Sequence, residues 1–292
     1  MKIRKAVIFA AGMGTRFFPI TKTIQKEMLP ILDKPIIDYI VDDCIEAGIE
    51  EVIIVVNDKN NQIESFYSED QYIYRYLERM KKLDKYSKIS KLHSKMTFKF
   101  VRQNETDSYG TAVPLKLARE YLQGEEAFLA LTGDDFFLNE SGNSEIKLMI
   151  ENFEKNNADG LITCIQVPME RVSQYGIAEF REENGVKLLT NQIEKPEPSQ
   201  VNSNFVTLSK SIFNPKIFDY LDKVEPDSKT GELYLTTAFT QLAQNGKVII
   251  YEPKGKYIDT GNVNSWLIAN ILLARQNPEI WEKLSDFVNT VF

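Results

Sequence analysis

Short apolar runs rich in β-branched residues alternate with helical patterns through the first half of the chain, and this alternation constrains the fold most strongly. The apolar runs are Lys5–Ala10, Glu51–Val56, Thr97–Val101, Ala127–Thr132 and Gly160–Val167. The helical patterns between them are Pro35–Ala47, Gln71–Lys88 and Thr111–Leu122. Strands that alternate with helices form βαβ units, so we predict a mainly parallel sheet with helices on both faces.

The second half, after about residue 170, has a different pattern. Its strand-like segments are shorter and are joined by polar residues, which predicts a more antiparallel region; they are Tyr175–Phe180, Val186–Ile193 and Asn204–Leu208. Helical patterns return at Glu232–Gln244, at Asn262–Gln276 and after Pro278. Because no linker separates the halves, we expect one body with a ligand pocket where the parallel strands end.

Charge and composition argue against several classes of protein. The net charge of -7 argues against a general nucleic-acid binder, and no run has the ~18 consecutive apolar residues of a membrane span. The N-terminus runs into the first strand rather than into a secretory signal. Cys44 and Cys164 lie in apolar segments without metal or redox spacing, so we expect core thiols and a cytoplasmic protein. The single histidine, His93, has no partner motif, which removes histidine-based catalysis.

One local stretch, residues 75–99, is rich in Lys and Arg despite the acidic total. A solvated helical face with a loop is the simpler interpretation of this stretch. A cationic rim over an anionic substrate is the alternative.

The first apolar run breaks into Gly12-Met13-Gly14, a pattern typical of phosphate-binding turns. Glycines let the backbone approach a ligand, and the amides of such a turn point at anions. A dinucleotide-binding loop requires a small residue where Phe17 stands. Arg16, and Lys26 in the segment KEMLP, add two cations. We therefore favour phosphate binding over a plain strand–loop–helix connection.

Two aspartates follow apolar segments. Asp134 comes just after the Ala127–Thr132 run, and Asp259 ends the short segment KYID. Carboxylates past the ends of parallel strands lie where such sheets bind ligands, and their oxygens suit Mg²⁺. If the two meet, they would form a metal site for a polyphosphate. Gly-Asp-Asp is also ordinary turn chemistry, so the sequence leaves both interpretations open.

Two further polar motifs suggest ligand contacts. In Glu194-Lys195-Pro196, a carboxylate that accepts sugar hydroxyls stands next to a lysine that can reach a phosphate, although a solvated turn has the same composition. The amide of Gln103 can pair with the edge of uracil or thymine, although a polar strand end is an equal alternative.

Together these motifs resemble, in order and spacing, the sugar nucleotidyltransferases, and most closely the bacterial UTP–glucose-1-phosphate uridylyltransferases. The similarity spans about residues 5–276 and rests on AAGMGTRFFP, TKTIQKEMLP, RQ…GTA, GDD, YGIAEF, IEKPEP, NSNF and YIDTGN. It implies an α/β fold, a Rossmann-like, mainly parallel mixed sheet flanked by helices, with a smaller β-rich subregion on the sugar side. The domain would be residues 1–276, with a nucleotide-binding part at about 1–170 and a sugar-side part at about 171–261. Residues 262–292 would form a C-terminal helical segment.

The resemblance also implies roles for single residues. The nucleotide would be held by Ala10, Ala11, Gly12 and Gly14, with Glu27 a weaker candidate for the ribose and Gln103 reading the pyrimidine. Arg16 would take the departing pyrophosphate, while Lys26 and Lys195 would neutralise phosphates on the sugar side. Mg²⁺ would be held by Asp134 and Asp259, and the sugar pocket would be lined by Gly176, Glu194 and Asn204. Members of the family are usually oligomeric, so a homodimer or homotetramer is expected.

The implied reaction is transfer of a uridylyl group from UTP to glucose 1-phosphate, giving UDP-glucose and pyrophosphate. A sugar phosphate, with a second pKa of ~6, is largely a dianion at neutral pH and needs no general base. Ser108 stands where the family usually has a base-cradling glycine, so a thymidylyltransferase or another sugar-1-phosphate nucleotidyltransferase stays an alternative. A non-catalytic sugar-nucleotide-binding relative is another, and a nicotinamide oxidoreductase is a third.

Overall fold

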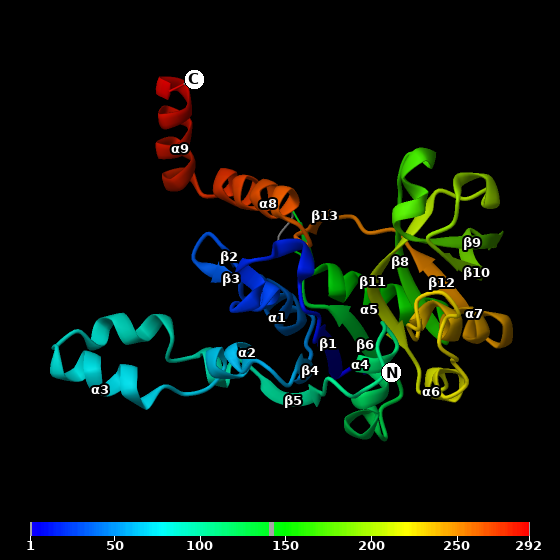
Figure 1. The fold of residues 1–292 in the computed structure, drawn as a ribbon, viewed down its shortest axis with the longest axis horizontal. Helices are drawn as coiled ribbons and strands as arrows, with labels where there is room; N and C mark the ends of the chain where they lie inside the picture. The colour runs from blue at the N-terminus through cyan, green and yellow to red at the C-terminus, as the bar shows by residue number, and fades with distance from the viewer. Residues whose placement is uncertain (1, 140–142, 292) are drawn as a thin grey trace.

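The computed structural model describes residues 2–139 and 143–291 of the 292-residue chain. At its centre is a nine-stranded mixed sheet with the strand order β5-β4-β1-β6-β11-β8-β12-β10-β9. Helices cover both faces of this sheet, and α8 and α9 project away from the body at the top of the view (Figure 1). The predicted α/β class with a mainly parallel nucleotide-side sheet is therefore confirmed.

The first half supplies the parallel strands, which are β1 (Lys5–Ala10), β4 (Glu51–Asn57), β5 (Thr97–Gln103) and β6 (Phe128–Thr132). β1 pairs in parallel with both β4 and β6, and β4 pairs in parallel with β5. Strands buried on both faces need continuous apolar runs. That is why β1 and β4 were recognisable from their Val- and Ile-rich sequences.

The second half adds β9 (Gly176–Glu183), β10 (Val186–Glu194), β11 (Phe205–Phe213) and β12 (Val248–Tyr251) beside β8 (Gly160–Gln166). β11 pairs antiparallel with both β6 and β8, and β9 pairs antiparallel with β10. The predicted antiparallel character is correct, except that β12 runs parallel to β8. Since β11 lies between β6 and β8, both predicted parts share one sheet; the part and domain boundaries stay predictions.

Two apolar clusters fill the two faces of the sheet. One contains buried residues of α1 (Ile36–Glu46) and α5 (Glu145–Asn156), together with Cys44. The other contains residues of α4 (Val113–Leu117), α6 (Ile217–Leu221) and α7 (Leu235–Asn245), together with Cys164. Both cysteines are buried free thiols, as predicted.

Two predicted helices are shorter than expected. Thr111–Leu122 contains only α4, which stops at Leu117, and a 3₁₀ turn, η6 (Arg119–Leu122); the Ala112 amide before α4 donates to the Leu233 carbonyl (3.0 Å). In Gln71–Lys88, α3 (Gln71–Arg79) ends two residues before Lys81, which has a left-handed φ of 54°, and a 3₁₀ segment, η4 (Leu83–Lys88), follows. Local periodicity therefore overestimated both lengths.

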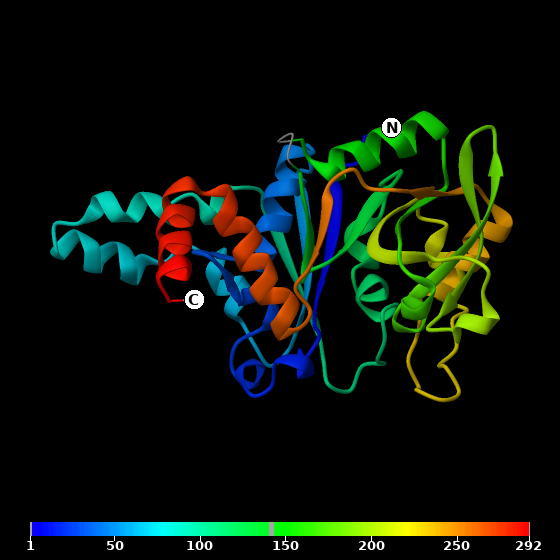
Figure 2. The ribbon, with the colours of Figure 1, turned by 90° about the horizontal axis from the view of Figure 1, so that it is seen from above.

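The α3–η4 segment forms a helical hairpin that projects from the body (Figures 1 and 2). No residue of α3 or η4 is buried, which favours the solvated-face interpretation of the basic stretch. α8 (Val263–Gln276) and α9 (Pro278–Val291) were predicted closely. The elements without a sequence prediction include the helix α5 and the short elements α6 and β12. They also include α2 (Gln62–Phe66), β2 (Pro30–Ile31) with β3 (Lys34–Pro35), and β7 (Asp135–Leu138) with β13 (Lys256–Asp259). Among the described helices, none combines the length and apolarity needed to cross a bilayer.

Candidate active site

The predicted phosphate-binding residues lie at the carboxyl ends of β1 and β6, which are neighbours in the sheet. Phe9 of β1 is in register with Thr132 of β6, and the Gly133 amide donates to the Phe9 carbonyl (3.0 Å). The glycine loop follows β1, and Asp134 follows β6. Both therefore emerge at the edge where parallel sheets bind ligands.

The glycine loop wraps around the Lys26 side chain. Gly14 has a left-handed φ of 62°, and a Cβ there would lie 3.2 Å from the Cβ of Lys26. A Cβ at Gly12 would lie 3.4 Å from Lys26 Cε. Phe17 is buried in the core, which anchors the 3₁₀ turn η1 (Thr15–Phe17) after the loop. Phe17, whose size argues against a dinucleotide-binding loop, thus anchors a loop of a different kind.

Lys26 and Asp134 form an ion pair at the centre of the site. The distance from Lys26 Nζ to Asp134 Oδ2 is 2.6 Å, and that to Glu27 Oε1 is 3.7 Å. Burial lowers the pKa of Lys26, but Asp134 and Glu27 more than offset this, so the pKa lies above its ordinary value. Lys26 is therefore a fixed cation.

Asp134 and Asp259, which the sequence could not place relative to each other, come together. The Thr260 amide and hydroxyl both donate to the Asp134 carbonyl, at 3.2 and 2.6 Å. A Cβ at Gly261 would lie 3.0 Å from Asp259 Oδ1, 3.6 Å from Arg16 Nη1 and 3.7 Å from Asp134 Oδ2. Arg16 and the two carboxylates thus converge around this glycine.

The environment of Asp259 is acidic, and its side chain is half-buried. Burial raises the pKa of this carboxyl, the charges of Asp135 and Asp134 raise it further, and the Gly261 amide and Arg16 oppose the rise. A cation bound here would relieve that repulsion. The donor set fits Mg²⁺, which commonly takes one or two carboxylates and completes its shell with water and substrate phosphates. Within residues 2–139 and 143–291, no cluster of three or more acidic, His or Cys residues could hold a metal on protein ligands alone.

A group of contacts around Asp135, which sequence reasoning missed, holds the residues next to Asp134 in place. Lys210 of β11 is 1% exposed and forms an ion pair with Asp135 Oδ1. The same carboxylate accepts from Thr132 Oγ1 (2.7 Å) and from the Tyr257 hydroxyl (2.8 Å). Asp135 is therefore fully engaged within the protein. The signal in the sequence was that Lys210 is the single charged residue of β11.

Glu27 lies beneath the glycine loop rather than at its surface. Its side chain is 0% exposed, and neither carboxylate oxygen has a hydrogen-bond partner among the described residues. Burial raises the pKa of Glu27 to about 8, although Lys26 opposes the shift. A Cβ at Gly133 would lie only 3.0 Å from Glu27 Cγ. Contact with a ribose stays a prediction.

The predicted base-reading residues lie together at the end of β5. Gln103 Nε2 is 3.5 Å from the Ser108 carbonyl. The loop that carries Ser108 is pinned at Gly110, which has a φ of 127°, and a Cβ there would collide with the Leu233 backbone at 2.4 Å. The backbone around Ala10 and Ala11 continues from β1 into the glycine loop. Recognition of the base by Gln103 stays a prediction.

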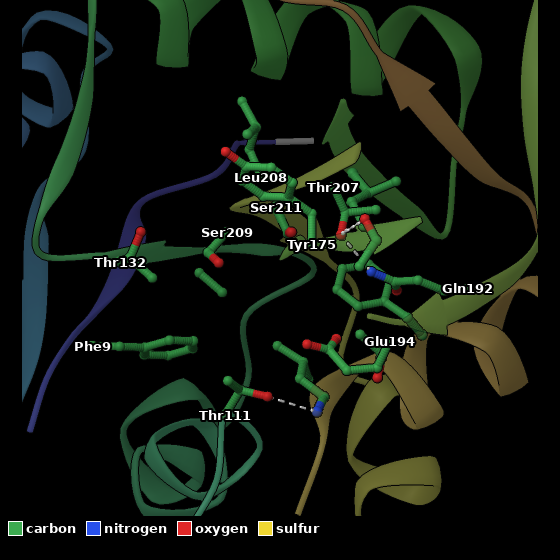
Figure 3. A pocket seen from close by; sticks show the side chains of 16 residues that line it. Phe9, Thr111, Thr132, Tyr175, Gln192, Glu194, Thr207, Leu208, Ser209 and Ser211 are labelled. Carbon is green, nitrogen blue, oxygen red and sulfur yellow. Dashed lines mark hydrogen bonds between the residues drawn. The ribbon is translucent and has the colours of Figure 1, made fainter. Parts of the chain in front are cut away.

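Part of the predicted sugar side borders a cavity of about 210 Å³ (Figure 3). Gly176 and Glu194 line this cavity, together with side chains that the sequence did not single out, notably Gln192 and Thr207. Lys195, with a left-handed φ of 45°, is exposed beside it, with Nζ 3.7 Å from Glu194 Oε1. Asn204 is not among the lining residues; its Nδ2 donates to the Val167 carbonyl (3.0 Å). Burial raises the pKa of Glu194, and Lys195 opposes the rise.

Known proteins resemble this chain over nearly its whole length. The family model described as Nucleotidyl transferase matches residues 5–276. The UTP–glucose-1-phosphate uridylyltransferase of Bacillus subtilis (strain 168) is 35% identical over 288 residues, covering 98% of this chain and 96% of that protein. UTP–glucose-1-phosphate uridylyltransferase 2 of Staphylococcus saprophyticus is 34% identical, covering 98% of this chain and 97% of that protein.

Solved structures agree. The UTP-bound UGPase of Acinetobacter baumannii has a TM-score of 0.89 and 28% identity over 100% of both chains. A UDP-glucose pyrophosphorylase in complex with UDP-glucose has a TM-score of 0.83 and 31% identity, over 94% of this chain and 100% of the other. The chain therefore belongs to the nucleotidyl transferase family, among the UTP–glucose-1-phosphate uridylyltransferases.

Proposed function

We propose that this protein transfers a uridylyl group from UTP to glucose 1-phosphate, releasing pyrophosphate and forming UDP-glucose. The observation that carries the proposal is the meeting of Arg16, Lys26, Asp134 and Asp259 at one sheet edge, next to a cavity that contains Glu194. Membership of the uridylyltransferases supports the choice of substrates.

In this proposal the site has a nucleotide end and a sugar end. The backbone from Ala10 to Gly14 holds the UTP phosphates, and Gln103 with the Ser108 loop holds the uracil. On the opposite side, Glu194 and the Gly176 backbone receive the hexose. Lys195 beside Glu194 faces the sugar phosphate, and Asn204 supports the wall through Val167.

The chemistry requires two polyanions to meet in line. A phosphate oxygen of glucose 1-phosphate attacks the α-phosphorus of UTP, the bond to the β-phosphate oxygen breaks, and pyrophosphate leaves. The nucleophile is already a dianion, so the protein supplies no base. Lys26 and Lys195 neutralise the approaching phosphates, and Arg16 neutralises charge that develops on pyrophosphate. These three cations stabilise the transition state because the protein fixes their positions before the reaction.

Mg²⁺ would be held by Asp134 and Asp259 with the nucleotide phosphates, where it would supply charge neutralisation and orientation. Within the protein, Asp134 also fixes Lys26 through their 2.6 Å ion pair. The Thr260 contacts hold the Asp134 backbone beside Asp259.

The test is a matrix of nucleoside triphosphates and sugar 1-phosphates, with pyrophosphate release as the readout. We expect the highest kcat/KM with UTP and glucose 1-phosphate, and loss of turnover when EDTA removes divalent cations. Preference for dTTP would reject uridylyl transfer in favour of thymidylyl transfer. No turnover with any pair would reject the enzyme and leave a sugar-nucleotide-binding protein.

The proposal also includes a homodimer or homotetramer in the cytoplasm. Support for self-association comes from large apolar side chains that α8 and α9 expose to solvent, namely Val263, Leu267, Ile268, Ile271, Phe287 and Val291. Exposed apolar residues commonly mark an interaction surface where they gather into a patch. Light scattering of the full chain at several concentrations would test the assembly.

A further inference from the structure

Gln192 lines the cavity next to Glu194, on the strand β10 that also carries Glu194 (Figure 3). Its Nε2 donates to Thr207 Oγ1 at 2.8 Å. Its Oε1 is buried and has no hydrogen-bond partner among the described residues. A buried acceptor that lacks a donor costs free energy, so its retention in a binding cavity calls for an explanation.

The neighbouring hydrogen bonds fix which way this amide points. The Thr207 hydroxyl donates its single proton to the Gly176 carbonyl at 3.1 Å. Thr207 can therefore only accept from Gln192, so the Gln192 nitrogen must face it and the oxygen must face elsewhere. The Gln192 backbone is held as well, since its amide donates to Thr240 Oγ1 of α7 (3.0 Å). Amide orientation is thus set by the protein before a ligand arrives.

The three polar groups crowd the bare backbone of Gly176. A Cβ at Gly176 would lie 2.8 Å from Thr207 Oγ1, 3.2 Å from Glu194 Oε2 and 3.4 Å from Gln192 Nε2. Glu194 is an acceptor, whereas Gln192 offers both an unused N–H and an unused carbonyl oxygen. A hydroxyl can donate and accept at once, so two neighbouring sugar hydroxyls would satisfy this set.

We propose that Gln192 is a sugar-specificity residue that hydrogen-bonds one hydroxyl of the hexose 1-phosphate, with Thr207 as the positioning residue that orients its amide. The proposal rests on the proposed sugar-phosphate substrate and narrows it to a hexose with a free hydroxyl at the position Gln192 reads. A site built to bond a hydroxyl discriminates strongly against an analogue that lacks it, because polar groups are left unpaired.

The experiment measures kcat/KM with UTP for glucose 1-phosphate and its 2-, 3-, 4- and 6-deoxy analogues, in wild type and in Gln192→Met. We expect Gln192→Met to lower kcat/KM for glucose 1-phosphate by ~10-fold, the scale of one lost hydrogen bond. For one of the four deoxy analogues, the wild-type kcat/KM is lower than for glucose 1-phosphate. This difference disappears in Gln192→Met, because removing the hydroxyl and removing the amide abolish the same contact.

Two further variants separate recognition from a structural role. Gln166→Met, on the exposed end of β8, is the matched control and should leave every value unchanged. Thr207→Val should reduce the difference in kcat/KM between glucose 1-phosphate and the same analogue, and Thr207→Ser should restore this difference. A structural defect would instead lower kcat/KM for all five sugars alike and lower the melting temperature.

The outcomes also separate this inference from the proposed function. If wild type turns over none of the sugar phosphates, the proposed function fails. If wild type is active but the differences in kcat/KM for all four deoxy analogues are equal in wild type and Gln192→Met, the function stands and the role of Gln192 is wrong.

Discussion

The nucleotide end and the sugar end of the site differ in how their polar groups are satisfied. At the nucleotide end, cations are paired with aspartates within the protein, as in Lys26 with Asp134 and Lys210 with Asp135, although the buried Glu27 carboxylate has no hydrogen-bond partner in the described chain. At the sugar end, the cavity is walled by hydroxyls and an amide, and Gln192 Oε1 has no partner in the described chain. The first arrangement suits fixed electrostatic stabilisation of phosphates, and the second suits recognition completed by the ligand.

Asp134→Asn should have the largest effect on activity. It removes the charge that pairs with Lys26 and one of the two carboxylates proposed to hold Mg²⁺. We expect kcat to fall by more than ~10³-fold while circular dichroism and melting temperature stay near wild type. Near-normal turnover would mean that a different carboxylate serves the metal.

Lys26→Met should cost ~10²–10³ in kcat, the scale of one preorganised electrostatic contact. The methionine keeps much of the chain that packs against Gly12 and Gly14, so the glycine loop is retained. Lys283→Met, on the exposed face of α9, is a matched charge-loss control. Equal rates for these two variants would contradict a catalytic role for Lys26.

Lys210→Met should lower the stability of the protein at the nucleotide end. It leaves Asp135 buried without its cation, which costs about 3–5 kcal/mol of the free energy of unfolding. Urea denaturation measures this loss, and Lys210→Arg should recover part of it by restoring the charge. If Lys210→Met is as stable as wild type, the ion pair does not stabilise this end.

Glu27→Gln should change how stability depends on pH. The folded pKa of Glu27, about 8, exceeds the ordinary value of 4.5, so between these pH values the folded state holds a proton that the unfolded state has lost. This group therefore lowers the free energy of unfolding as pH rises from about 4.5 to 8, by ~1.4 kcal/mol per pKa unit at most.

Glutamine cannot ionise, so the variant should lose less stability than wild type between pH 5 and pH 8.5. Urea denaturation at both pH values provides the comparison. Identical losses in the two proteins would show that Glu27 is ionised in the folded state throughout this range.

The two ends also differ in how well they could be predicted. β1 was predicted with its observed bounds, because a Val- and Ile-rich run followed by glycines is a local signal. The sequence also identified the charged residues of this end, which are Arg16, Lys26, Asp134 and Asp259. Whether these residues meet depends on the pairing of β7 with β13. This pairing joins distant parts of the chain, since Tyr257 and Asp135, which are in contact, are 122 residues apart in the sequence. Likewise, the Ala112 amide bonds Leu233, which no local pattern shows.

The sugar end gave weaker signals. Glu194 and Gly176 were identified by resemblance, whereas Gln192 and Thr207 look like ordinary polar positions of strands. Their relation appears only when β9, β10 and β11 are adjacent, since Gly176 pairs with Glu194 and Val206 pairs with Ile177. Polar residues such as these can be assigned a role only when the structure shows which of their atoms have hydrogen-bond partners and which do not.

Hydrogen–deuterium exchange with UDP and with UDP-glucose tests the division into two ends most directly. UDP should slow exchange in residues 10–16 and 103–112. UDP-glucose should protect the same residues and, in addition, residues 175–178, 192–195 and 204–211. Glucose-dependent protection confined to other segments, or UDP protection confined to the Glu194 cavity, would contradict the assignment of the nucleotide and sugar ends.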